Sequence, residues 1–99
     1  MKLLELLKAV KEEHMVKSQL ETYHTSLSNM AADLAIELAE LKKEKAMFEA
    51  SDPNKSVAKM KVEWKGTEKG QRLLLLEGYM KATTTQLKSL RNRIYADFN

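Results

Sequence analysis

The chain has no cysteine, one proline, three glycines and one tryptophan among its 99 residues. Without cysteine there is neither a disulfide framework nor a thiolate metal site. So few turn-forming residues fit a helical protein better than a β-sandwich, which needs more turns, and the composition does not fit a disordered tail either. No apolar run approaches the roughly 20 residues that cross a bilayer. Because Glu5 and Lys8 also interrupt the apolar N-terminal stretch, we predict a soluble cytoplasmic protein with no signal peptide and no membrane contact.

What the sequence does contain is typical of one strongly helical domain: 43% of its residues are hydrophobic and 31% are charged. The net charge of +3 is unevenly distributed along the chain. Residues 1–41 carry a balance of −3, residues 42–72 carry +4 and residues 73–99 carry +2. This asymmetry indicates either a surface that binds a polyanion or complementary charge between two helices.

Two long segments show apolar residues at alternating steps of three and four, the rhythm of an amphipathic helix that packs against another helix. In the first segment the positions are Leu20, Tyr23, Leu27, Met30, Leu34, Leu41 and Phe48, with Glu37 and Glu44 at two further positions of the same stripe. In the last segment they are Leu73, Leu76, Met80, Thr83, Leu87, Leu90 and Ile94. We therefore predict an all-α fold: a long antiparallel helical hairpin, coiled-coil-like, with a short connecting helix.

The predicted boundaries form a single helical domain over 1–99. We expect a separately docked N-terminal helix within 1–15, because Leu3, Leu7, Val10 and His14 share a face in a different phase from the later stripe. The first long helix is predicted over 16–50, the short helix over 53–65 and the final helix over 67–98.

Capping and turn residues predict where the helices begin and end. Asp52 is predicted as an N-cap with Pro53 at the first helical position, where its missing N–H costs least. Gly66 is predicted as the C′ residue of the short helix and Thr67 as the N-cap of the next. Gly70 and Gly78 weaken the final helix, which suggests close approach of another helix at both.

A two-helix hairpin cannot cover two broad apolar stripes by itself, so we expect a homo-oligomer or a partner's helix to cover the remainder. The predicted oligomer or partner interface consists of Leu20, Leu27, Leu34, Leu41, Leu76, Met80, Leu87, Leu90 and Ile94.

The sequence contains no motif typical of a catalytic or metal-binding site. We therefore predict that the protein is not an enzyme and binds no cofactor or metal. His14 and His24 are ten residues apart, and no HExxH pattern is present. The "KGTEKGQR" stretch is not a Walker loop, which needs GxxxxGK[ST] after a strand.

Basic residues extend over the second half of the chain and are our predicted nucleic-acid contacts. They are Lys55, Lys59, Lys61, Lys65, Lys69, Arg72, Lys88, Arg91 and Arg93. We also expect N–H groups at the start of the final helix to suit a backbone phosphate. Trp64 and Tyr95 offer base stacking, although Trp64 is in phase with Val57 and Met60, which favours a core position.

The residues "WKG" at 64–66 and "YADFN" at 95–99 resemble the signatures of the WXG family, helical hairpins exported by type VII secretion. In that family Trp-x-Gly lies in the turn between two helices, and a Tyr-x-x-x-Asp/Glu signal follows the second. Here Trp64 lies past the midpoint, and the fourth position after Tyr95 is Asn99, so we rank this resemblance second.

A more extended resemblance covers "MAADLAIELAELKKEKAMFEA" and "EWKGTEKGQRLLLLEGYMKATTTQLKSLRNRIY". These segments look like small helical accessory proteins of phage recombination and replication modules, including recombination mediators. The resemblance implies an oligomer in a bacterial cytoplasm that binds single-stranded DNA and assists a recombinase, an annealing protein or a single-strand-binding protein. The alternative is a protein–protein interaction module without nucleic-acid binding, either an adaptor or an inhibitor of a host machine such as an anti-defence protein.

Overall fold

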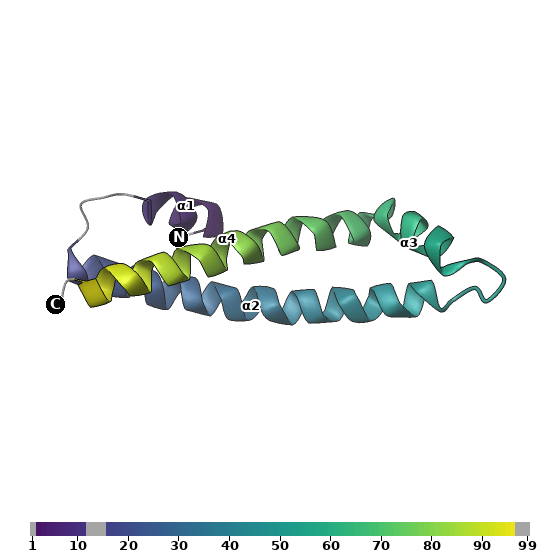
Figure 1. Ribbon diagram of the computed structural model, residues 1–99, viewed down its shortest axis with the longest axis horizontal. Helices are drawn as coiled ribbons and strands as arrows, with labels where there is room; N and C mark the ends of the chain where they lie inside the picture. The colour runs from purple at the N-terminus through teal and green to yellow at the C-terminus, as the bar shows by residue number, and fades with distance from the viewer. Residues whose placement is uncertain (1, 12–15, 97–99) are drawn as a thin grey trace. The chain divides into compact units, whose positions relative to one another are not determined.

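The structure, a computed structural model, describes residues 2–11 and 16–96. In these ranges the chain forms four helices and no strand: α1 (Leu3–Ala9), α2 (Lys17–Glu49), α3 (Val57–Lys65) and α4 (Glu68–Ala96). The two long helices α2 and α4 pack together, as predicted for a helical hairpin (Figure 1). His14 and the end of the final helix predicted at residue 98 lie outside the described residues.

The chain divides into two compact units, and both long helices pass from one into the other. The terminal unit comprises Met1–Asp33 and Met80–Asn99, and the middle unit comprises Leu34–Tyr79. Each unit has its own buried apolar residues and is described separately below.

In the terminal unit, α1 docks on the N-terminal half of α2 and the C-terminal half of α4 (Figure 1). The fully buried cluster consists of Leu6, Leu7, Val10, Leu20, Leu27 and Leu90. Seven residues are too few for a helix to be stable alone in water, so α1 depends on this docking. Each leucine in the cluster contributes about 1.5–3 kcal/mol by leaving water.

In the middle unit, α3 packs through Met60 and Trp64, which are 2% and 4% exposed. The Trp64 ring lies against the Phe48 ring of α2, with 5.6 Å between the centroids and 54° between the planes. The predicted core position of Trp64 is confirmed. Val57 is exposed, because it is the first residue of α3.

The loop before α3 differs from the prediction. The Asp52 carboxylate accepts a hydrogen bond from the Asn54 N–H at 3.0 Å, which holds Pro53 in a turn and not in a helix. The helix begins four residues later, where the Ser56 side chain accepts from the Lys59 N–H at 3.2 Å. The prediction of Asp52 as N-cap and Pro53 as first helical residue is therefore wrong.

The junction of α3 and α4 is tightly built around Thr67. Its hydroxyl accepts from the Gly70 N–H at 3.0 Å and donates to the Trp64 carbonyl at 2.6 Å, so the predicted N-cap is confirmed. Gly66 is the C-cap of α3 with φ −80°, in the right-handed region. The prediction of Gly66 as the C′ residue is therefore wrong by one position.

The two glycines of α4 lie in opposite environments. A Cβ on Gly70 would lie 1.9 Å from the Trp64 carbonyl oxygen, so Gly70 marks close approach of the end of α3. A Cβ on Gly78 would meet no atom within 4 Å. The predicted close approach is therefore confirmed at Gly70 and wrong at Gly78, within the described chain.

The residues predicted as an oligomer interface are the chain's own core. Leu20, Leu27, Leu34, Leu41, Leu76 and Leu90 are all at most 8% exposed, and Met80, Leu87 and Ile94 are partly buried. The prediction overlooked that α1 and α3 help to cover the stripes. Self-association stays a prediction, and it needs a surface made of other residues.

Candidate functional site

Three of the nine cations predicted to bind nucleic acid form ion pairs within the middle unit. Lys55 Nζ lies 3.1 Å from Glu63 Oε1 and Lys69 Nζ lies 3.1 Å from Glu44 Oε1. Arg72 Nε donates to Glu37 Oε1 at 2.5 Å, and this hydrogen bond together with the carboxylate charge raises the pKa of Arg72. The acids Glu37 and Glu44, which the sequence placed at positions of the apolar stripe, thus serve as partners for cations of α4.

These pairs weaken the prediction of a phosphate site at the start of α4. The Thr67 hydroxyl already accepts from the Gly70 N–H, and carboxylates of α2 hold Lys69 and Arg72. The Gln71 side-chain amide donates to the Lys65 carbonyl, and not outward. The donors and charges expected to converge on a phosphate there are directed to groups of the chain itself.

Three lysines of α3 remain exposed: Lys59, Lys61 and Lys65. Among the described residues they have no ion pair. Together with the pairs above, they leave the middle unit with only a small excess of positive charge.

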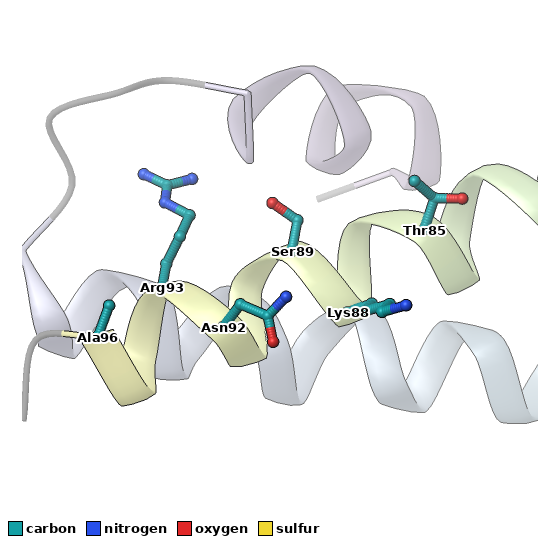
Figure 2. A pocket seen from close by; sticks show the side chains of 6 residues that line it. All are labelled: Thr85, Lys88, Ser89, Asn92, Arg93 and Ala96. Atoms are coloured by element: carbon teal, nitrogen blue, oxygen red, sulfur yellow. The ribbon is translucent and has the colours of Figure 1, made fainter.

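Another group of cations lies along α4, from Lys81 to Arg93 in the terminal unit. Residues 78–96 contain Lys81, Lys88, Arg91 and Arg93 and no aspartate or glutamate. Lys88 and Arg93 lie at a shallow hollow of about 420 Å³ on the helix surface. The complete lining is Thr85, Lys88, Ser89, Asn92, Arg93 and Ala96. Figure 2 shows these side chains projecting from successive turns of α4.

Two of the side chains that line the hollow donate hydrogen bonds to backbone carbonyls of the chain. Arg93 Nη1 donates to the Val10 carbonyl at 2.9 Å, which caps the C-terminal end of α1 and fixes the guanidinium beside the hollow. The Thr85 hydroxyl donates to the Lys81 carbonyl one turn earlier at 3.0 Å. Lys88, Ser89 and Asn92 are exposed and carry donors that suit an anion.

Sequence reasoning predicted Lys88, Arg91 and Arg93, but missed the uncharged residues that line the hollow. Thr85, Ser89 and Asn92 recur at i, i+4 and i+7, a spacing that places them on one helix face beside Lys88. Arg91 does not line the hollow, although it is exposed.

Of the two aromatic residues predicted to stack on bases, only Tyr95 lies at the surface. Tyr95 is 61% exposed and belongs to the last turn of α4, close in sequence to Asn92 and Arg93. Trp64 is buried between helices, so stacking on Trp64 is a wrong prediction.

Six large apolar side chains in the middle unit are exposed. They are Ile36 and Met47 on α2, Val57 and Val62 on α3, and Leu74 and Leu75 on α4.

In the described ranges, no group of three or more histidine, aspartate or glutamate residues is arranged to hold a metal ion. None of the four helices there combines the length and the apolar character that a bilayer crossing requires. Comparison of the chain with protein-family models, curated proteins and solved structures finds no match.

Proposed function

We propose that this chain is a small accessory protein that binds single-stranded nucleic acid without sequence preference, through the acid-free face of α4. The observation that carries the proposal is the 78–96 segment, with four cations, no carboxylate and a hollow lined by Lys88, Arg93 and neutral donors. Phosphate contacts of this kind attract any sequence.

Two further features support a single strand as the ligand. Tyr95 is exposed beside the cations, and aromatic side chains add about 1–3 kcal/mol per stacked base without sequence preference. Lys59, Lys61 and Lys65 offer a second group of exposed cations on α3. The role in phage recombination, with a recombinase, annealing or single-strand-binding protein as partner, extends this proposal by resemblance alone.

The test is the salt dependence of binding to a labelled oligothymidine, followed by fluorescence anisotropy. If Lys81, Lys88 and Arg93 each neutralise one phosphate, the logarithm of affinity falls by about 2 per tenfold rise in salt. Affinity then drops about 20-fold between 50 and 200 mM salt. Undetectable binding at 50 mM salt would overturn the proposal.

A paired substitution locates the site. Lys81→Gln with Lys88→Gln removes two contacts, so the salt slope falls to about 0.7. The matched control is Lys42→Gln with Lys43→Gln, which removes the same charge from exposed positions of α2 and leaves the slope near 2. Equal slopes for the two double variants would place the strand elsewhere.

The exposed apolar residues of the middle unit favour a second candidate, a protein–protein interaction module. Large apolar side chains at a surface mark sites for protein partners when they gather in one region. A photo-crosslinking residue at Leu74 would then give a discrete protein adduct in the producing cells, and the same residue at Lys42 would not. Absence of an adduct from Leu74 would contradict this alternative.

A further inference from the structure

The part of α2 in the terminal unit has the opposite charge character to α4. Residues 17–33 contain Lys17, Glu21 and Asp33, a balance of −1. Residues 80–96 of α4, in the same unit, contain four cations and no acid. Segregation of charge to this degree on two helices of one unit is a basis for mutual recognition between copies.

Both segments also present an unpartnered face opposite their buried leucines. On α2 this face consists of Ser18, Thr22, Thr25, Asn29 and Ala32, at alternating steps of four and three. On α4 it consists of Ala82, Thr85, Ser89, Asn92 and Ala96, at steps of three and four. All ten residues are exposed. We call them the α2 outer face and the α4 outer face.

Both outer faces carry a shallow hollow and share the same spacing of small residues. Each carries a shallow hollow of about 420 Å³, at Ser18–Ser26 on α2 and at Thr85–Ala96 on α4. Thr22 and Thr85 each donate their hydroxyl to the carbonyl four residues earlier, at 2.8 and 3.0 Å. Their polar groups are thereby satisfied within the helix, and side chains this small allow helices to approach to about 8 Å.

Charged side chains flank both faces at positions suited to pairing. Glu21 and Asp33 are adjacent to the α2 outer face, and Lys81, Lys88 and Arg93 are adjacent to the α4 outer face. Glu21 has one internal partner, Lys17 Nζ at 3.8 Å, and both side chains are about half exposed. An exposed pair at that distance contributes little, so Glu21 can exchange it for a new partner.

We propose that the α2 outer face of one copy docks on the α4 outer face of a second copy. Each copy then offers one face of each sign, so the contact is head-to-tail and builds a ring or a chain of copies. The second copy and a nucleic-acid strand use the same cations of α4. Self-association therefore regulates access to the strand site, and this last point rests on the proposed function.

The docking can be tested without nucleic acid. Light scattering measures the mass of the whole chain in solution across about a hundredfold range of protein concentration at 50 mM salt. We expect the mass to rise above the monomer's 11.3 kDa with concentration and to return to it in about 500 mM salt. A wild-type chain that stays at the monomer mass throughout overturns the proposal.

Charge reversal identifies the two faces. Glu21→Lys with Asp33→Lys removes the acidic face, and Lys81→Glu with Lys88→Glu removes the basic face. Each double variant alone should stay monomeric. An equimolar mixture should assemble again, because the intact faces carry opposite charges and the two reversed faces do so as well. Mixtures that stay monomeric, or single variants that assemble like wild type, overturn the pairing of these faces.

Competition is tested by strand affinity. Glu21→Lys with Asp33→Lys should bind oligothymidine more tightly than a control with Glu68→Lys and Glu77→Lys, which adds equal charge at exposed positions of α4 in the middle unit. If the two double variants bind oligothymidine with equal affinity, the proposed competition between self-association and strand binding is overturned. The docking of the two faces is then still decided by the mass measurement. If no variant binds oligothymidine, the proposed function is overturned. The docking of one copy on another is still tested by the light-scattering mass.

Discussion

Gly70 and Gly78, eight residues apart on α4, provide a matched pair of alanine substitutions with opposite expected signs. In an exposed helix interior, glycine to alanine stabilises by about 0.5–1 kcal/mol. Gly78 is exposed and a Cβ there finds open space. Gly78→Ala should therefore show the full gain and raise the melting temperature by about 2–8 °C.

At Gly70 the same substitution meets backbone atoms. The new Cβ would lie 1.9 Å from the Trp64 carbonyl oxygen and 2.8 Å from its carbon. That carbonyl cannot move freely, because it accepts from the Thr67 N–H at 2.9 Å and from the Thr67 hydroxyl at 2.6 Å. Overpacking of this kind costs about 1–3 kcal/mol, which exceeds the propensity gain. We expect a net loss of about 1–2 kcal/mol and a melting temperature lower by about 5–10 °C.

The assay is thermal unfolding followed by circular dichroism at 222 nm, with urea titrations to give the free energy of unfolding. Trp64 fluorescence gives a local readout, because Gly70→Ala must displace the end of α3 while Gly78→Ala leaves it in place. If Gly70→Ala melts at or above the wild-type temperature, the close packing of α3 on the start of α4 is refuted.

Substitutions at three further positions test the core, the surface and the junction of α3 and α4. Leu27→Ala, at a position with no exposed surface, should lower the free energy of unfolding by about 2–5 kcal/mol in urea titration. Leu74→Ala, at a position 48% exposed, should change it by less than about 0.5 kcal/mol, and similar losses at both positions would contradict the assignment of core and surface. Thr67→Ala should cost about 0.5–2 kcal/mol through loss of the N-cap, whereas Thr67→Ser should retain most of the stability because serine keeps the hydroxyl. Equal melting temperatures for the two Thr67 variants would show that the cap contributes nothing.

Periodicity in the sequence was sufficient to predict the helical hairpin, because apolar residues at steps of three and four define a buried stripe regardless of what covers it. Leu73, Leu76 and Leu90 are buried as expected. What periodicity cannot predict is the identity of the covering element. For that reason we expect a homo-oligomer or a partner's helix over the stripes from the sequence alone, whereas α1 and α3 of the same chain cover part of them.

The candidate site was predictable only in part, for a related reason. Counting charges along the chain locates lysines and arginines, but which of them are neutralised depends on side chains far away in sequence. Arg72 meets Glu37 across 35 residues, and no local pattern marks that pair. Residues 78–96, which include Lys88 and Arg93, contain no carboxylate of their own, a property the sequence does show.

The hydrogen bond between Arg93 and Val10 also bears on the order in which the chain folds. It joins residues 83 positions apart. Closing a loop of that length costs about 2 kcal/mol more than closing one of ten residues, by the logarithmic dependence on length. Once α2 and α4 have packed together, however, Leu20 and Leu90 lie in the same buried cluster, and only a short loop separates Leu20 from Val10. Docking of α1 is therefore expected to follow hairpin formation, and its amides should exchange with deuterium before those of the long helices.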